Sequence, residues 1–399
     1  MLDHSYLLAM SRRGLDRLPE LRDVAWSKGG GKQLRSFSIW EICQFMLKIP
    51  PDTLRKKLAD NPSLPQGEVA PDGRQRWFTL AEVNELRRRI KFRGGLMLPE
   101  RPKGRAIRTA VANFKAEGGK TTVAQHLAHS AALDGYRVLL VDFDTSAALT
   151  QAMGLKNIDA SHTLWGLLCR DLYQNSTETL PQQVQSIGAL RAQDFIHKTC
   201  WPTIDVIPAT AKTAFAEFAL ARFRKLDPSW SYFAAVDRYL NALPEDQYDI
   251  ILFDCPPAID QKALNAFFAA DILYVPTGPT YSEFESTAAF LRQLGRASAE
   301  IQTDFAALRL VQTKFSAKDD RHLITQAAYQ NGYGADLASH PIEWVDLLDQ
   351  PDEHRSSVFE FDYRQITREE WKAARRSFDN AYAEFRETVM QVWAKLDPE

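Results

Sequence analysis

The sequence predicts an α/β protein with a mostly parallel, twisted sheet that is flanked by helices and preceded by a small, differently built domain. From residue 106 onward, apolar runs such as RVLLVDF and YDIILFD alternate with helical stretches. Strands that are apolar throughout are buried on both faces, and the helices between them connect parallel strands. Before residue 106 the sequence shows helix caps and a hairpin turn in place of regularly alternating strands and helices. A chain of 399 residues therefore contains at least two domains.

The N-terminal 93 residues are predicted to form a helical arm, residues 1–34, and a compact module, residues 35–93. The arm ends in the loose segment GGGK. Ser38 and Glu41 form a capping box that starts the first helix of the module. Pro51 suits the first position of a second helix.

A hairpin and a third helix complete this module. The sequence PDGR at residues 71–74 is a favourable hairpin turn. Thr79 and Glu82 form another capping box, which starts the helix LAEVNELRRRI. Helix–turn–helix, hairpin and helix is the order of a winged helix-turn-helix DNA-binding domain. Residues 94–105 are predicted to be a linker, and residues 106–399 the α/β domain.

Charge is unevenly divided along the chain, although the net charge is only −2. Residues 1–110 contain 22 Lys+Arg against 12 Asp+Glu, and the remainder contains 27 against 39. A basic N-terminal domain on an acidic body favours contact with a polyanion. The alternative interpretation is a basic surface that is merely solvated.

Other features of the composition indicate a soluble cytoplasmic protein. No run of about 18 apolar residues predicts a membrane span. The N-terminus has an early acid and no long apolar stretch, unlike a signal peptide. The four cysteines, at 43, 169, 200 and 255, show no CxxC spacing, and this is typical of a reducing compartment without structural zinc.

The segment NFKAEGGKTT, residues 113–122, resembles a phosphate-binding loop. It follows the predicted strand AIRTAVANF and opens a helix, which is the context such a loop requires. Main-chain N–H groups and the helix N-terminus would meet the phosphates of a nucleotide. Lys120 would reach the β- and γ-phosphates, and Thr121 would coordinate Mg²⁺. The nucleotide-binding residues of this loop are predicted to be Lys115, Gly118, Gly119, Lys120, Thr121 and Thr122.

Two acidic strand ends support the same interpretation. VLLVDFD ends in Asp142 and Asp144, and YDIILFDCPP places Asp254 after four apolar residues. The second has the Walker B form, in which the aspartate holds the Mg²⁺ shell. Either aspartate alone could be an ordinary strand-capping residue. Their occurrence in the expected order predicts a P-loop NTPase.

These motifs resemble the deviant Walker A signature KGGxGKT[ST] of the ParA/MinD group of ATPases. VLLVDFD is similar to the switch I region of that group, and FDCPP to its Walker B motif. The winged module and the C-terminal stretch ITREEWKAARRSFDNAYAEF are similar to the larger plasmid-partition ParA proteins, especially the RepA type of repABC plasmids. The resemblance covers about residues 35–395.

The resemblance implies a set of roles for the matched residues. Lys115 is implied as the signature lysine that reaches the nucleotide of the partner subunit in an ATP-bound homodimer. Lys120 is implied as the phosphate-loop lysine, Asp144 as the residue that orients the attacking water, and Asp254 as the Walker B acid. Lys115, Lys120 and Asp144 are thus the implied catalytic residues, and Thr121, Asp144 and Asp254 the residues at the metal. The implied cofactors are ATP and Mg²⁺.

The loop departs from the family pattern. Ala116 and Glu117 replace the two usual glycines, and Thr145 and Ser146 replace Pro and Gln in switch I. If position 117 requires a left-handed backbone, a non-glycine costs about 1–2 kcal/mol. Repulsion between the carboxylate of Glu117 and a phosphate charge at about 5 Å would cost roughly 3 kcal/mol for each charge. Alternatively, Glu117 points to solvent and Gly118 supplies the freedom.

Two surfaces are predicted to bind DNA. In the module, the second helix and the wing carry Thr53, Arg55, Lys56, Lys57, Arg74 and Arg76. Such residues contact bases and phosphates in other winged domains. The alternative is a module that binds protein.

Near the C-terminus, Thr367 and Glu370 cap a helix on which Arg368, Lys372, Arg375 and Arg376 recur with helical spacing. This stripe is either a solvated face or, by the resemblance, a sequence-independent DNA-binding face.

The sequence supports two functional hypotheses. The first is a plasmid-partition ATPase, acting with a ParB/RepB-like centromere-binding protein on the nucleoid and repressing its own operon through the winged domain. The second is a non-hydrolysing repressor that senses nucleotide, an interpretation motivated by Ala116, Glu117, Thr145 and Ser146. A membrane-associated MinD-like ATPase is disfavoured, because the C-terminus MQVWAKLDPE is short and acidic.

Overall fold

The structure of the protein is a computed structural model. It describes residues 5–6, 9–14, 16–17, 32–70, 75–93, 95–101, 104–176, 179–349, 355–361 and 367–396. Within the expected N-terminal arm, residues 5–6, 9–14 and 16–17 are helical. The glycines of GGGK and the expected turn at 71–74 lie outside the described residues. No described helix is both long and apolar enough to cross a membrane.

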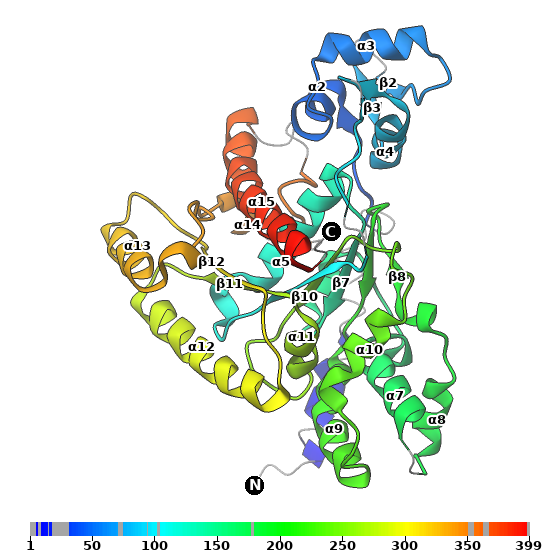
Figure 1. Cartoon of the computed structure of the whole chain (residues 1–399), viewed down its shortest axis with the longest axis vertical. Coiled ribbons are helices and arrows are strands. Elements are labelled where there is room, and N and C mark those ends of the chain that lie inside the picture. Colours follow the sequence, from blue (N-terminus) through cyan, green and yellow to red (C-terminus); the bar gives the residue numbers. More distant parts are fainter. Residues whose placement is uncertain are drawn as a thin grey trace.

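Seven strands form the central sheet, in the order β12-β11-β6-β10-β7-β9-β8 (Figure 1). Neighbouring strands run parallel except β8 and β9, which pair antiparallel at one edge. The mostly parallel sheet expected from the sequence is confirmed. The strands are β6 (Ile107–Val111), β7 (Val138–Asp142), β8 (His197–Lys198), β9 (Ile204–Ile207), β10 (Ile250–Asp254), β11 (Ile272–Thr277) and β12 (Ala307–Gln312).

Each face of the sheet carries its own hydrophobic cluster. In β7, Val138 and Leu140 belong to one cluster, and Leu139 and Val141 to the other, as the alternation of side chains along a strand requires. The first face packs against α5 (Lys120–Asp134) and α15 (Arg368–Leu396). The second cluster contains residues of α7 (Leu164–Asn175), α8 (Gln182–Gly188), α10 (Ala235–Asn241), α11 (Ala263–Ala269) and α12 (Tyr281–Ile301). Further helices are α6 (Ala148–Ala152), α9 (Phe215–Leu226), α13 (Asp320–Tyr333) and α14 (Asp346–Asp349).

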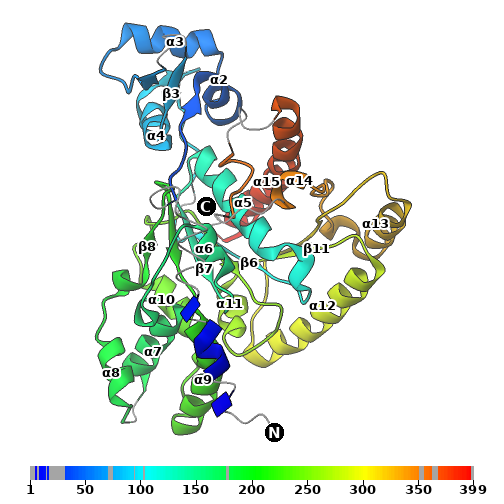
Figure 2. The ribbon, with the colours of Figure 1, turned by 180° about the vertical axis from the view of Figure 1, so that it is seen from behind.

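The N-terminal module lies at one end of the molecule, with α3 outermost (Figures 1 and 2). Its elements are β1 (Phe37–Ser38), α2 (Ile39–Glu41), the π-helical turn η1 (Ile42–Met46), α3 (Pro51–Asp60), β2 (Glu68–Val69), β3 (Arg76–Phe78), α4 (Leu80–Arg89), β4 (Lys91–Phe92) and β5 (Gly95–Leu96). Strands β1, β3 and β2 form an antiparallel sheet. Strand β5 pairs with β4 and lies within the segment expected to be linker.

Both capping boxes predicted for the module are confirmed. The Ser38 hydroxyl accepts a hydrogen bond from the N–H of Glu41, and the Glu41 carboxylate accepts one from the N–H of Ser38. Thr79 and Glu82 make the same reciprocal pair at the start of α4. Each cap satisfies N–H groups that the first helical turn leaves without partners.

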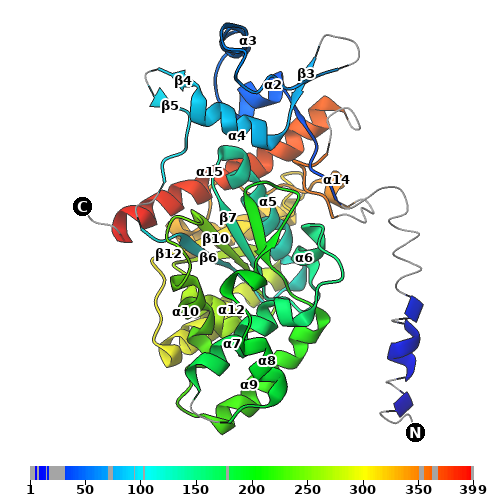
Figure 3. The same cartoon turned by 90° about the vertical axis from the view of Figure 1, so that its right-hand side faces the viewer.

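The module is packed against the α/β body rather than held only by the chain. Arg87 on α4 is 1% exposed, and its guanidinium donates to the carbonyl oxygens of Met46 (3.2 Å) and of Leu133, in the last turn of α5. Helix α15 runs beneath α2 and α4 (Figure 3). Trp371 of α15 packs against Phe45, with ring centroids 5.8 Å apart. One hydrophobic cluster therefore continues from the module into the body.

Candidate nucleotide-binding site

The expected phosphate loop lies at the carboxyl end of β6 and opens α5. Residues Ala116–Gly118 form a short 3₁₀ turn, and Gly119 follows with φ of 78°. A Cβ atom at Gly119 would be strained in this left-handed conformation. Neither Ala116 nor Glu117 has a positive φ, so the backbone penalty expected for a non-glycine at 117 does not arise. The glycine that the turn requires is Gly119, not Gly118.

Two side chains of the first turn of α5 point into the loop and the sheet edge. Lys120 is 4% exposed, and its ammonium donates to the carbonyl oxygen of Lys115 at 2.8 Å. Burial lowers the pKa of Lys120, and the negative charge of Asp254 acts in the opposite direction. The Thr121 hydroxyl donates to Asp254 Oδ2 at 2.7 Å. The structure thus brings Lys120, Thr121 and Asp254 together.

Three aspartates lie at the carboxyl ends of two neighbouring strands, β7 and β10. Asp254 ends β10 and lies beside Asp142, which ends β7. Burial, and then the charge of Asp142, raise the pKa of Asp254 well above its usual range. Burial raises the pKa of Asp142 to about 6, and hydrogen bonds from Thr150 oppose that shift. Asp144, which is half-buried, accepts a hydrogen bond from the N–H of Ser146 at 2.8 Å.

These groups suit a Mg²⁺ ion bound together with phosphates. Asp254 Oδ1 is buried and has no hydrogen-bond partner among the described residues, so one carboxylate oxygen is left for a ligand or its water. A threonine hydroxyl and a Walker B aspartate are the usual protein groups at such an ion. Among the described residues, no cluster of three or more His, Cys, Asp or Glu side chains could hold a metal alone. Phosphate oxygens and water would supply the remaining ligands of such an ion.

A cavity of about 790 Å³ opens in front of the loop. Its walls come from α5, from residues 144–146 and 148, from residues 256–258, and from Asp260 and Lys262. Gln125 and His126 of α5 line it as well, as do Leu348, Arg355 and Ser356. A second cavity of about 190 Å³ adjoins Gly119 and Thr122 on the side of β12. It is lined by Thr313, Lys314, Glu343, Trp344, Leu348 and Phe378, among others.

Sequence reasoning missed several residues of the larger cavity. Lys262 is 3% exposed and pairs with Asp260, just after the Walker B strand. Its position eight residues after Asp254 is a signal that could have found it, because side chains that follow a strand end gather at one edge of a parallel sheet. Gln125 and Arg355 have no such signal, since 230 residues separate them.

Three of the four departures from the family pattern are at exposed positions. Ala116 and Glu117 are exposed, as is Ser146, whereas Thr145 is half-buried. Lys115 is half-buried, and its ammonium has no partner among the described residues. It does not line the cavity of its own subunit. This placement leaves the Lys115 ammonium available to another molecule.

Of the module residues expected to bind DNA, some are exposed to solvent, and others are half-buried or already make contacts within the module. On α3, Arg55 and Lys56 are exposed, Thr53 and Lys57 are half-buried, and Arg55 pairs with Asp52. Leu54 and Leu58 form the inward face of that helix. Arg76 turns back to the main-chain oxygen of Gln66, at 2.9 Å. Arg74 lies outside the described residues.

The expected basic stripe on α15 is not one exposed face, and this corrects the prediction for Arg375. Arg375 is 3% exposed, lies 3.8 Å from the ring centroid of Phe45 and pairs with Asp379. It follows Trp371 by four residues, on the face that packs against the module, so apolar packing overrides the charge pattern. Lys372 and Arg376 are exposed. The side chain of Arg368 is not among those that the structure describes.

Comparison with known proteins places this site in a family. The family model for an AAA domain (AAA_31) matches residues 106–307. A protein named "Putative replication protein A" from Sinorhizobium fredii is 28% identical over 91% of this chain and 88% of its own. The chromosome-partitioning ATPase Soj of Thermus thermophilus is 30% identical over 55% of this chain and 72% of its own.

Solved structures show the same fold. A structure titled "Partition Protein" aligns with a TM-score of 0.62 at 17% identity, over 96% of this chain and 98% of that one. A plasmid partition protein of Borrelia burgdorferi bound to AMPPNP aligns with a TM-score of 0.51 at 18% identity, over 74% and 100%. The sheet order, the loop at the start of α5 and the family match agree. The chain belongs to the AAA domain family of ParA-type P-loop NTPases.

Proposed function

We propose that the protein is an ATPase of ParA/RepA type that segregates plasmid DNA. The observation that carries the proposal is the contact of Thr121 with Asp254 beside the buried Lys120, at the N-terminus of α5. Phosphates bind at such a helix end because its N–H groups and dipole face them. A relative that matches 91% of the chain is named as a replication protein, and one that matches 53% of it is named as a chromosome partitioning protein.

In this proposal ATP binds with its phosphates on the N–H groups of Gly118, Gly119, Lys120, Thr121 and Thr122. Its base enters the smaller cavity beside Trp344, which is apolar enough to take an aromatic ring. Bound Mg²⁺ neutralises phosphate charge near Thr121 and Asp254. Asp144 orients the attacking water, and its half-buried carboxylate at the cavity wall suits that role.

Dimerisation and partner binding complete the proposed cycle. The ammonium of Lys115 reaches the nucleotide of a second copy, so that ATP joins two subunits. The dimer binds DNA without sequence preference through α15, where Lys372 and Arg376 are exposed. A ParB/RepB-like centromere-binding protein stimulates hydrolysis. The protein acts in the cytoplasm on the nucleoid.

The N-terminal module is proposed to bind operator DNA and to repress the operon. Residues 1–34 serve as an arm, residues 35–93 as the winged domain and residues 94–105 as a connection. Helix α3 faces away from the body (Figure 2) and exposes Arg55 and Lys56. A basic helix at the outer end of a basic module suits the major groove.

Steady-state ATP hydrolysis tests the proposal most directly. Wild-type protein is measured with and without duplex DNA and with the cognate centromere-binding protein, against Lys120→Ala. We expect turnover above the variant that rises with both additions. Wild-type turnover equal to Lys120→Ala under every condition would refute the ATPase function.

A second candidate is a repressor that binds nucleotide without hydrolysing it. Glu117 favours it, because its carboxylate stands in the loop where the family pattern has a glycine. Thr145 and Ser146 at the cavity wall also depart from the pattern. Operator binding that changes with ATP, combined with no turnover above Lys120→Ala, would support this candidate over the first.

A further inference from the structure

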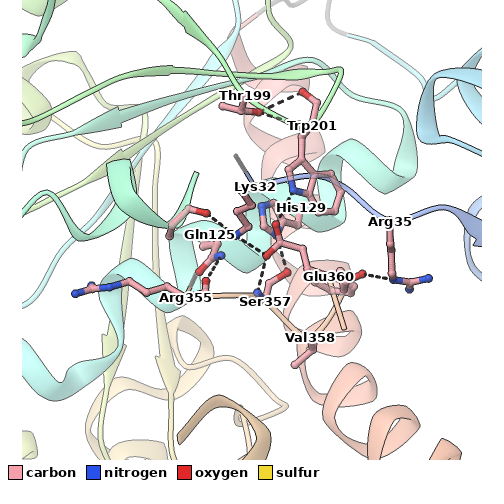
Figure 4. A network of polar contacts seen from close by, with 12 residues as sticks. Lys32, Arg35, Gln125, His129, Thr199, Trp201, Arg355, Ser357, Val358 and Glu360 are labelled. Atoms are coloured by element: carbon pink, nitrogen blue, oxygen red, sulfur yellow. Dashed lines mark hydrogen bonds and ion pairs between the residues drawn. The ribbon is translucent and has the colours of Figure 1, made fainter. Parts of the chain in front are cut away.

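A C-terminal segment, residues 355–361, lies along the helix that opens with the phosphate loop (Figure 4). Gln125 Nε2 donates a hydrogen bond to the carbonyl oxygen of Arg355 at 2.9 Å. One turn further along α5, His129 Nδ1 lies 2.7 Å from the hydroxyl of Ser357. Two side chains on one face of α5 therefore hold this segment at the side of the nucleotide cavity.

Glu360 anchors the same segment to the body. Its carboxylate accepts hydrogen bonds from the N–H of Ser357 (2.7 Å), from Trp201 Nε1 (3.1 Å) and from the ammonium of Lys32 (2.9 Å). The carboxylate and its lysine are almost fully buried. A carboxylate with three donors holds one geometry, so the position of the preceding residues is strongly determined.

Arg355, at the start of this segment, has a strained backbone. Its φ is 46°, in the left-handed region that a residue with a Cβ atom rarely adopts. Such strain persists where surrounding contacts over-determine it, and it is common at binding sites. The contacts from Gln125 and Glu360 supply that constraint. The strained residue is an arginine at the wall of the nucleotide cavity.

The cations of the cavity differ in how they are already engaged. Lys120 donates to the carbonyl oxygen of Lys115, and Lys262 is paired with Asp260. The guanidinium of Arg355 is exposed and has neither hydrogen bond nor ion pair with the residues that the structure describes. It lines the larger cavity together with Thr121 and Asp144, and it is not among the residues that line the smaller cavity beside Trp344. Arg355 therefore lines the cavity proposed for the phosphates and not the cavity proposed for the base.

We propose that Arg355 binds the terminal phosphates of the nucleotide, as a third cation beside Lys120 and Lys262, which line the same cavity. This inference rests on the proposed nucleotide binding. A guanidinium binds two phosphate oxygens at once and stays charged. It also offsets the negative charge that Glu117 adds to the loop. The chain thus supplies from its C-terminal segment a positive group that its altered loop requires.

Nucleotide affinity tests this role without depending on hydrolysis. Arg355→Asn removes the cation, and asparagine tolerates a left-handed backbone, so folding is preserved. Arg355→Lys retains a charge without the planar fork. The matched control is Arg296→Ala, an exposed arginine on α12 that does not line this cavity. Affinities for ATP, ADP and AMP are measured with Mg²⁺ by calorimetry or fluorescent analogues.

We expect Arg355→Asn to weaken ATP binding by about 10- to 100-fold, the loss typical of a hydrogen bond to a charged group. ADP should be weakened less and AMP not at all, while Arg355→Lys falls between and Arg296→Ala matches the wild type. Equal ATP affinity of wild type and Arg355→Asn overturns the inference, even if DNA binding is lost. A wild type that binds no nucleotide overturns the proposed function together with it.

Discussion

At the scale of single residues, the loop keeps the one glycine that its backbone requires and tolerates two substitutions next to it. Gly119 has the left-handed backbone, so the glycine that the turn needs is retained. Ala116 and Glu117 occupy a short 3₁₀ turn at exposed positions, where a side chain meets no steric obstacle. Glu117 can therefore affect nucleotide binding through its charge, and neither altered residue strains the backbone. This distinction was not accessible from the sequence, which shows two glycines in the loop, Gly118 and Gly119, and no dihedral angles.

Replacing Glu117 by glutamine should strengthen ATP binding, because it removes a negative charge near the phosphates at constant size. Since the side chain is exposed, solvent screens the charge and the gain should be only several-fold. The affinity of wild type and Glu117→Gln is compared at low and high salt. We expect the difference to shrink as the salt concentration rises. A gain that is independent of salt would mean that Glu117 acts through the shape of the loop.

At the scale of elements, α5 is the helix on which the site depends. It carries Lys120 and Thr121 in its first turn, Gln125 and His129 along one side, and the Leu133 carbonyl in its last turn. His126, one turn after Thr122, donates from Nδ1 to the main-chain oxygen of Thr122. Its other ring nitrogen accepts from the N–H of Val358. Only a neutral ring can make both hydrogen bonds, because one nitrogen must donate while the other accepts.

Acid should therefore destabilise the protein through the histidines of α5. Burial lowers the pKa of His126 to about 3 and that of His129 well below its usual value. The unfolded chain takes up these protons below about pH 6.5, whereas the folded protein does not. Stability is fully present above pH 6.5 and falls as pH decreases toward 3. At pH 5 His126 should account for a loss of about 2 kcal/mol, and His129 should add a loss of the same sign.

Chemical denaturation between pH 5 and pH 7.5 measures this effect, as the difference between wild type and His126→Gln. The variant should be less stable at neutral pH but lose less stability on acidification. His340→Gln serves as the control, because His340 is exposed and pairs with Glu384. Parallel stability curves for wild type and His126→Gln would contradict a neutral buried imidazole.

The position of α5 in the chain was predictable from the sequence, but its contacts with distant residues were not. The loop, the helix start at Lys120 and the Walker B aspartate follow from local patterns, because strand, loop and helix are contiguous in the chain. No motif in the sequence singles out His126 or His129. Their partners, such as Ser357 and Val358, lie more than 220 residues away. Arg375 shows the opposite failure. Its place in a stripe of basic residues predicts an exposed side chain, but the structure buries that side chain against Phe45.

At the scale of the whole molecule, the basic module and the acidic body are joined by a buried interface. The charge division was visible in the sequence, but the docking of α4 and α15 was not. Arg87 lies at the centre of this junction, and burial lowers its pKa to about 10. Its hydrogen bonds close the carboxyl end of α5 against the module.

Arg87→Met should destabilise the protein by about 2–4 kcal/mol, because two buried carbonyl groups lose their donor while the volume is nearly kept. Urea denaturation measures the loss. The neighbouring Arg88→Met is a matched control, since Arg88 is exposed and pairs only with Glu85 among the described residues. Similar stabilities for the two variants would show that the module is held by apolar contacts alone.

If the module binds DNA, its contribution should be measurable through salt. Replacing Arg55, Lys56 and Lys57 on α3 by alanine should lower the slope of log affinity against log salt by up to about 3. The measurement is operator binding at several salt concentrations, with Arg292 and Arg296 of α12 replaced as the control for lost charge. A slope unchanged by the α3 substitutions would favour a module that binds protein.

The continuous hydrophobic cluster also limits how this chain can be recombined. Phe37 and Leu54 of the module and Trp393 near the end of α15 belong to the same cluster. Exchanging the first hundred residues with those of a relative would set a foreign surface on α4 and η1 against this α15 and α5. A working chimaera must therefore carry both ends of the chain together, because the N-terminal module and the final helix share one hydrophobic cluster.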